Sequence, residues 1–348
     1  MRLFRRLVGL SLALLLLAAS AGATDVGVKF SDVPDDHWAS DSVRWASHYG
    51  LISGVGGGAF GLGRNVTRAE YATMLCRLMG WPLTAPEAGS FSDNQDTGAW
   101  YFAAIEIAHA HGVLPRLSGD QCGPGEAISR SEMAAMTVRA LGYSALAGAV
   151  QDDCPFADVT VNAGYIALAY HMGFLHGMDR WNFSPDRLCT REQAAAVLLR
   201  VHDRLHDYIA QTTGPVPEGV DAMYAESLTG NAGSVPVSPR APLESVYDAA
   251  VKAGAGGTVA LRTAPLLQTV KNGVVSEGEA ITEAELAELL ADAATQTAHS
   301  AQHESSYLTR READGSTTVV WYEAKEDLAE KALLCKLLGV DAVYFVKQ

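Results

Sequence analysis

The sequence predicts a mainly α-helical protein in which three repeats are followed by a small α/β or α+β module. Two observations indicate this fold class. A helix with a distinctive start recurs at nearly constant spacing, and strand-like and helical segments alternate in the last third of the chain. A repeat of about sixty residues with two short helices buries little surface alone, so the three copies are expected to pack into one body.

The first 23 residues have the pattern of a secretory signal peptide. They contain three arginines, an apolar run from Leu7 to Leu17, and a small-residue ending at Ala23. The run is too short to span a bilayer comfortably, so residues 1–23 are expected to be cleaved off. No other long apolar run follows, and we therefore expect an exported protein without a transmembrane segment after signal removal.

Composition excludes several classes of partner and site. The net charge of −14 argues against nucleic acid and anionic lipid. The five cysteines form no Cys-x-x-Cys pair, and their odd number leaves at least one thiol unpaired or intermolecular, with one or two disulfides still possible in principle. No metal site and no cofactor are predicted.

The repeats are defined by three related segments. They read "NVTRAEYATMLCRLMG", "AISRSEMAAMTVRALG" and "LCTREQAAAVLLRVHD", and their arginines Arg68, Arg130 and Arg191 are 62 and 61 residues apart. A Phe-x-Asp start and a first helix precede each segment. The repeats are assigned to residues 25–85, 86–147 and 151–206.

Each second helix is predicted to begin with a capping box, in which a hydroxyl accepts a backbone N–H and a side chain three residues later reaches back. The residues are Thr67 with Glu70, Ser129 with Glu132, and Thr190 with Gln193. The arginine after the cap residue is unfavourable at the positive end of the helix dipole and therefore needs another reason.

These repeats resemble S-layer homology domains, whose pattern has a Phe-x-Asp-Val start, a Trp at the first helix, a Gly-rich loop with Phe, and a Thr-Arg-Ala-Glu box. The first repeat matches at Phe30, Asp32, Val33, Trp38, Gly54, Phe60 and Thr67 to Glu70. The resemblance implies a pseudo-threefold helical bundle that anchors secreted proteins to the bacterial envelope. Such bundles bind secondary cell wall polysaccharide, often carrying ketal-linked pyruvate, in grooves between neighbouring repeats.

The resemblance implies polymer-binding roles for Arg68, Arg130, Arg191, Trp38, Trp100, Asp32 and Gly54. A guanidinium can hold a carboxylate bidentately, and first-turn N–H groups would add donors to the same anion. The alternatives are a solvated arginine or a salt bridge to a neighbouring repeat, and core anchoring for the tryptophans. Asp32, Asp93 and Asp158 are most simply turn or cap residues.

The three repeats depart unequally from the pattern. The second repeat lacks the loop phenylalanine, and the third has Val161 at the tryptophan position, with Tyr165 inside its first helix. Glu192 adds a negative charge beside the third arginine. A groove that uses Arg68 with Trp38 is therefore the first expectation.

The last third begins with a Gly/Pro/Ser-rich stretch, residues 207–242, which predicts a linker. Residues 243–348 alternate between helix and strand signals, including a helix over 282–302 and a hairpin that turns at Asp314-Gly315. The final forty residues are faintly similar to the last strand-helix-strand portion of family 18 glycoside hydrolases. That family's Asp-x-x-Asp-x-Asp-x-Glu motif is absent, and about 105 residues cannot form an eight-stranded barrel.

Other candidate sites are weak. His202 with His206 and His299 with His303 have the i, i+4 spacing of a two-ligand metal face on predicted helices, without the further ligands of a zinc site. Glu323 and Glu326 have no partner that the sequence can assign.

The predicted function is non-covalent attachment of an exported protein to anionic cell wall polysaccharide, with localisation at the bacterial cell wall or S-layer. The chain is not expected to be an enzyme. The alternatives are a wall-anchored glycoside hydrolase-like enzyme, and an S-layer protein whose C-terminal module self-associates.

Overall fold

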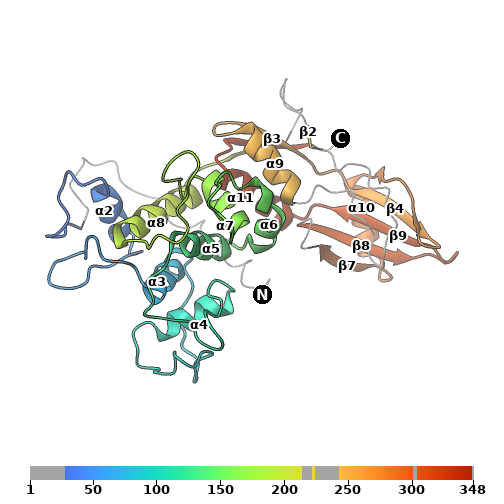
Figure 1. Ribbon diagram of the computed structural model, residues 1–348. Coiled ribbons are helices and arrows are strands. Elements are labelled where there is room, and N and C mark those ends of the chain that lie inside the picture. Colours follow the sequence, from blue (N-terminus) through green and yellow to red (C-terminus); the bar gives the residue numbers. More distant parts are fainter. Residues whose placement is uncertain (1–27, 214–221, 224–242, 301–303, 347–348) are drawn as a thin grey trace, which may run out of the picture. The chain divides into compact units, whose positions relative to one another are not determined.

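The computed structural model describes residues 28–213, 222–223, 243–300 and 304–346 (Figure 1). The predicted signal peptide, residues 1–23, lies outside this part of the chain. The chain divides after Asp203 into two compact units, called here the N-terminal unit and the C-terminal unit.

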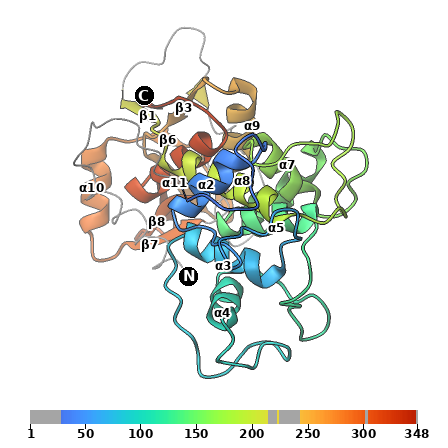
Figure 2. The same ribbon diagram turned by 90° about the vertical axis from the view of Figure 1, so that its left-hand side faces the viewer.

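The N-terminal unit consists of short helices joined by long loops (Figure 2). The helices are α2 (Ser40–His48), α3 (Arg68–Leu78), α4 (Phe102–Ala110), α5 (Arg130–Ala140), α6 (Ser144–Ala149), the 3-10 turn η2 (Gln151–Asp153), α7 (Ala163–His171) and α8 (Arg191–His206). Each repeat supplies a nine-residue first helix and a longer second helix. The second helix of one repeat packs on the first helix of the next, as α3 does on α4 and α5 on α7.

The second helices begin where the sequence places their caps. The Thr67 hydroxyl accepts the Glu70 N–H while the Glu70 carboxylate accepts the Thr67 N–H, and Ser129 and Glu132 form the same box. In the third repeat only half of the predicted box forms, because the Gln193 side-chain oxygen accepts the Thr190 N–H at 3.1 Å while the buried Thr190 hydroxyl has no hydrogen-bond partner. These caps fix the first residue of each helix, and so fix the arginine that occupies it.

The three repeats meet in a closed ring of backbone hydrogen bonds. Val66 donates to the Cys189 carbonyl at 2.9 Å, Ile128 to Val66 at 3.0 Å, and Cys189 to Ile128 at 2.9 Å. These equivalent residues are buried. Every repeat therefore contacts both others, and buried backbone groups that a single repeat would leave unpaired are satisfied.

The C-terminal unit contains two sheets. The first is a parallel sheet of order β1-β10-β3-β2, formed by β1 (Ala210–Thr213), β10 (Ala342–Val346), β3 (Thr258–Arg262) and β2 (Ala222–Met223). Helix α9 (Leu243–Ala253) packs on β3 and on α11 (Lys325–Leu337). These helices cover apolar strands, as parallel sheets require.

The second sheet is antiparallel, with the order β5-β4-β9-β8-β7 and β6 paired to β4. Its strands are β4 (Leu266–Lys271), β5 (Val274–Val275), β6 (Glu279–Ala280), β7 (Gln296–Ser300), β8 (Ser305–Arg311) and β9 (Thr317–Tyr322). Helix α10 (Glu283–Ala291) packs Leu286 against Leu308 and Val320 of this sheet.

Two expectations about this unit differ from the structure. Strands β1 and β2 lie inside residues 207–242, where composition predicted a linker, because pairing with β10 and β3 is a tertiary effect. The helix expected over 282–302 ends at Ala291, and strand β7 follows it in pairing with β8. The predicted turn at Asp314-Gly315 is confirmed, with Gly315 at φ 82° between β8 and β9.

Candidate functional site

The three repeat arginines are buried, and each reaches into the next repeat. Arg68, Arg130 and Arg191 have exposed fractions of 2%, 7% and 3%. Each Nη2 donates to a loop carbonyl of the following repeat, and the acceptors are Pro115, His176 and Ser53. Each Nε donates to a second carbonyl in the same loop, and these acceptors are Cys122, Phe183 and Phe60. The third arginine returns to the first repeat, so the contacts close a cycle.

The fork geometry of guanidinium explains why arginine occupies this position. Two carbonyls of one loop face two donors of one rigid plane, an arrangement that a lysine ammonium cannot match. The plane also lies over the loop phenylalanine, at 4.4 Å from Phe183 for Arg130 and 5.2 Å from Phe60 for Arg191. In the second repeat Cys122 stands at the phenylalanine position and keeps only the carbonyl contact.

The remaining nitrogen, Nη1, distinguishes the three arginines. Arg68 Nη1 forms an ion pair with Glu132 at 2.5 Å, and Arg191 Nη1 forms one with Glu70 at 2.8 Å. Within the described residues, Arg130 forms no ion pair. The third repeat has the neutral Gln193 at the position that Glu70 and Glu132 occupy in the first two repeats. The salt-bridge alternative is therefore confirmed for Arg68 and Arg191, and the solvated-surface alternative is wrong for all three.

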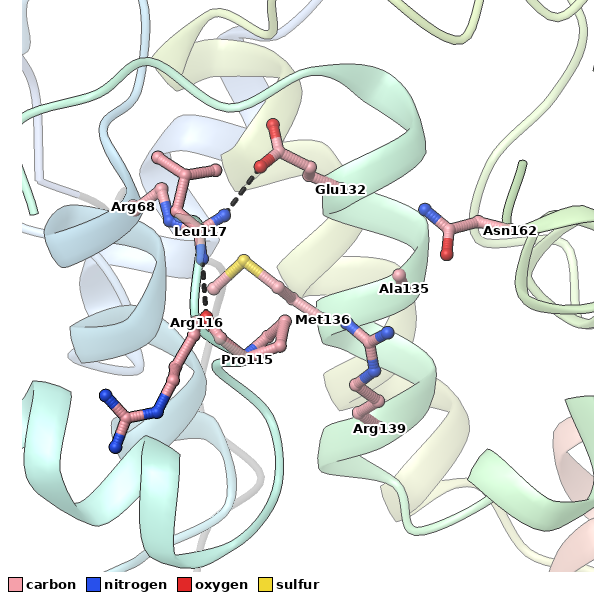
Figure 3. Close-up of a pocket in the computed structure, with 9 residues that line it drawn as sticks. All are labelled: Arg68, Pro115, Arg116, Leu117, Glu132, Ala135, Met136, Arg139 and Asn162. Carbon is pink, nitrogen blue, oxygen red and sulfur yellow. Dashed lines mark hydrogen bonds and ion pairs between the residues drawn. The ribbon is translucent and has the colours of Figure 1, made fainter. Parts of the chain in front are cut away.

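A pocket of about 120 Å³ lies at the junction of the first two repeats (Figure 3). It is lined by Arg68, Pro115, Arg116, Leu117, Glu132, Ala135, Met136, Arg139 and Asn162. Three arginines and one glutamate thus line a small volume, and the Arg116 side chain extends away from the other labelled residues (Figure 3). Arg139 is held in place by Tyr165, whose ring centroid is 4.6 Å from the guanidinium carbon.

This pocket corrects the expected pairing of Arg68 with Trp38. Its lining does not include Trp38, and the third repeat completes it with Asn162, whose side chain donates to the Ser131 hydroxyl at 3.0 Å. The arginine reaches forward to the next repeat, and the start of a first helix contacts the preceding repeat. This junction therefore draws on all three repeats.

The first-turn N–H groups are not available to a ligand as expected. Arg68 N–H donates to Glu126 and Ala69 N–H to Pro124, both carbonyls of the second repeat. Arg130 N–H donates to Arg187, and Arg191 N–H to Arg64. These amides hold neighbouring repeats together, so recognition of an anion at a junction depends on side chains.

The tryptophans are exposed rather than buried. The exposed fractions are 62% for Trp38 and 65% for Trp100, and Val161 at the equivalent place is 67% exposed. The core-anchor alternative is therefore wrong for both tryptophans. An exposed indole next to a groove is suited to stacking on a sugar ring.

Asp32 and Gly54 shape the first-repeat loop. The Asp32 carboxylate accepts the N–H groups of Phe60, Gly61 and Leu62 at 2.6, 2.7 and 3.0 Å. Burial tends to raise its pKa, but these bonds outweigh that effect and hold the pKa below the ordinary value of 3.8. A Cβ at Gly54 would lie 2.6 Å from the Ala59 carbonyl oxygen. Both residues therefore act on loop conformation, as the turn alternative predicts for Asp32.

Asp93 and Asp158 repeat this arrangement in the other two loops. Asp93 accepts the N–H groups of Cys122 and Gly123, and Asp158 accepts those of Phe183 and Ser184. Glu192, expected to act on the third arginine, instead accepts the Gly63 N–H at 3.0 Å.

The sequence does not predict several of the residues and contacts found at the junctions. Glu70 and Glu132 were assigned only to helix caps, but their carboxylates also pair with the arginine of the preceding repeat. A second arginine recurs nine positions after the first, at Arg77, Arg139 and Arg200, and only its spacing could have revealed it. All five cysteines are free thiols, and burial raises the pKa of Cys76 and Cys189 to about 12.

The titratable residues of the C-terminal unit form internal pairs. His299 lies on β7 rather than on a helix, where its Nε2 is 2.9 Å from the Asp327 carboxylate. His303 lies outside the described residues, and His202 and His206 do lie on α8 as predicted. Glu323 accepts the Lys331 ammonium at 2.7 Å, with both side chains buried. The described residues contain no cluster of His, Cys, Asp and Glu that could hold a metal ion.

The family and its relatives agree with the repeat geometry. The S-layer homology domain profile matches residues 29–72 and 155–195. The chain is 30% identical over 194 residues to the exoglucanase XynX of Acetivibrio thermocellus, covering 53% of this chain and 17% of that protein. It is 36% identical over 122 residues to the S-layer protein sap of Bacillus anthracis, covering 35% and 14%. A cellulosome-anchoring protein of Acetivibrio thermocellus is 31% identical over 146 residues, covering 41% and 32%.

The chain therefore contains S-layer homology domains, and these matches indicate a secreted protein of the cell surface. It spans less than a third of the length of the three relatives named. Of the helices in the described part of the chain, none combines the length and apolarity needed to cross a bilayer. The spore cortex-lytic enzyme SleL of Bacillus megaterium QM B1551 is 17% identical at a TM-score of 0.28, covering 33% of this chain and 28% of that one, and supports no conclusion.

Proposed function

We propose that the three repeats attach this protein non-covalently to anionic secondary cell wall polysaccharide at the junctions between repeats. The observation that supports this proposal is the cycle of buried arginines at the junctions, of which Arg68 and Arg191 direct Nη1 at a carboxylate of the following repeat. In two junctions Nη1 already holds a carboxylate. A guanidinium that pairs with a carboxylate inside the protein has the geometry to accept one from a ligand, such as ketal-linked pyruvate.

We further propose that the repeats are related by a pseudo-threefold axis through the ring of Val66, Ile128 and Cys189. The equivalent contacts of the three arginines support this arrangement. By the same equivalence, Asn162, which lines the pocket with Arg68, corresponds to Ala39 near Arg130 and to Tyr101 near Arg191, and Trp38 and Trp100 directly precede these two residues. The stacking of Tyr49 of α2 on His202 of α8, at 4.1 Å, supports the neighbourhood of the first and third repeats.

Binding to purified cell walls tests this function. The full chain is sedimented with bacterial walls that retain their secondary polymer, and with walls stripped of it by hydrofluoric acid. Binding is expected only to the intact walls, and Trp38→Ala is expected to weaken it without changing the unfolding midpoint, because the indole is largely exposed. Equal binding to both kinds of wall would contradict a role for the anionic polymer.

For the C-terminal unit we propose a displayed, non-catalytic module. Two buried carboxylates support this proposal, because Glu323, which the sequence singled out, pairs with Lys331, and Asp327 pairs with His299. Hydrolysis of peptidoglycan or chitin by the full chain would contradict it.

A further inference from the structure

We infer that the junction between the second and third repeats is the open receptor for a ligand carboxylate, and that Glu132 and Glu70 fill the same position in the other two junctions. This inference rests on the proposed wall-binding function. The residue that determines specificity is then the last residue of the capping box, which is Glu70 and Glu132 in the first two repeats and Gln193 in the third.

The three arginines make matched contacts with the loop of the following repeat and differ at Nη1, where this residue acts. Each arginine uses Nε and Nη2 on two loop carbonyls, so Nη1 is the nitrogen left for an acidic partner. Glu132 meets Arg68 Nη1, and Glu70 meets Arg191 Nη1 while also accepting Arg64 at 3.4 Å. These carboxylates occupy the place that a ligand anion would need, and both would have to be displaced before binding.

Arg130 has no such internal partner. It is 93% buried, since 7% of its surface is exposed, and within the described residues it forms no ion pair. The acid that acts on it electrostatically, Asp158, accepts the N–H groups of Phe183 and Ser184 and makes no ion pair with it. The side chain at the equivalent capping position, Gln193, is neutral and still caps its helix.

Positive charge as well as the negative charge of Asp158 acts on Arg130. Arg187 acts electrostatically on Arg130, and Arg200 acts on His176, whose carbonyl accepts from Arg130. A buried guanidinium without an acidic partner is costly unless an anion satisfies it. The open junction therefore offers a preorganised site for one carboxylate, such as that of a pyruvate ketal.

The sharpest test exchanges the capping residue and leaves every arginine in place. Gln193→Glu places a carboxylate where Glu132 and Glu70 already stand and cap their own helices, so the variant is expected to fold. A charge-assisted hydrogen bond contributes about 1.5–3 kcal/mol, so occupying Arg130 should weaken sedimentation of the full chain with intact walls about tenfold to a hundredfold. Gln151→Glu, on the exposed turn η2, adds the same charge outside the junctions and should bind like the parent chain.

The reciprocal variants complete the test. Glu132→Gln and Glu70→Gln keep a capping oxygen, as Gln193 does, and free Nη1 of Arg68 and Arg191. They should bind at least as tightly as the parent chain. Unchanged binding of Gln193→Glu, together with loss of binding in Glu132→Gln, would overturn the open-junction inference while leaving the anchoring function in place. A parent chain that fails to bind intact walls would instead overturn the anchoring function.

Discussion

Replacement of Arg68 by alanine tests whether the repeat arginines also hold the N-terminal unit together. The change removes three hydrogen bonds, to the Cys122 carbonyl at 2.7 Å, the Pro115 carbonyl at 3.1 Å and the Glu132 carboxylate. Only Cys122 is buried, so its orphaned carbonyl accounts for about 1–3 kcal/mol. The Glu132 side chain is 30% exposed and regains water, so loss of that pair contributes about 1 kcal/mol.

The expected destabilisation of Arg68→Ala is therefore about 2–4 kcal/mol. With a urea dependence of about 2 kcal/mol/M, the unfolding midpoint should fall by about 1–2 M. Tryptophan fluorescence is a suitable readout, because five of the six tryptophans lie in the N-terminal unit and only Trp321 lies in the C-terminal unit.

Arg116→Ala is the matched control, since this exposed arginine lines the same pocket and donates no hydrogen bond within the described residues. Its cost should stay within about 0.5 kcal/mol. In a double-mutant cycle, Arg68→Ala and Glu132→Gln should couple by about 1 kcal/mol. A loss below about 1 kcal/mol for Arg68→Ala would refute the conclusion that this arginine joins two repeats.

Three further predictions follow from other contacts. Gly54→Ala should destabilise the N-terminal unit by about 1–3 kcal/mol in the same urea assay, because the new Cβ would lie 2.6 Å from the Ala59 oxygen and 2.7 Å from Phe30 Cε1. The folded-state pKa of Asp32 lies below 3.8, so its contribution to stability is present above about pH 3.8 and is lost as the pH falls through the folded pKa. In urea titrations, the acid-induced loss in the free energy of unfolding should be smaller for Asp32→Asn than for the parent chain. Equal losses in the two chains would contradict this prediction. Lys331→Met leaves the buried Glu323 carboxylate without its ammonium partner and should destabilise the C-terminal unit by about 3–5 kcal/mol. The measurement is the fluorescence of Trp321 during urea unfolding, in a chain whose other tryptophans are replaced by phenylalanine. An unchanged free energy of unfolding would show that the pair contributes little.

The sequence by itself determined the local features of this protein. Helix starts at Thr67 and Ser129 could be predicted because a capping box needs only residues three positions apart, and at Thr190 only the half of the box that Gln193 supplies forms. The repeat spacing identified Arg68, Arg130 and Arg191 as equivalent, and the Asp314-Gly315 turn followed from local backbone preference.

Only the tertiary structure decided what these residues contact. Spacing along a chain does not say whether an arginine reaches its own repeat or the next, and the expected pairing of Arg68 with Trp38 is not found in the pocket that Arg68 lines. It also could not show that Glu132 serves both a cap and an ion pair, because the second partner is 64 residues away. The sequence does not predict strand β1 for the same reason: the short segment Ala210–Thr213 becomes a strand only when β10, more than a hundred residues later, supplies its hydrogen bonds.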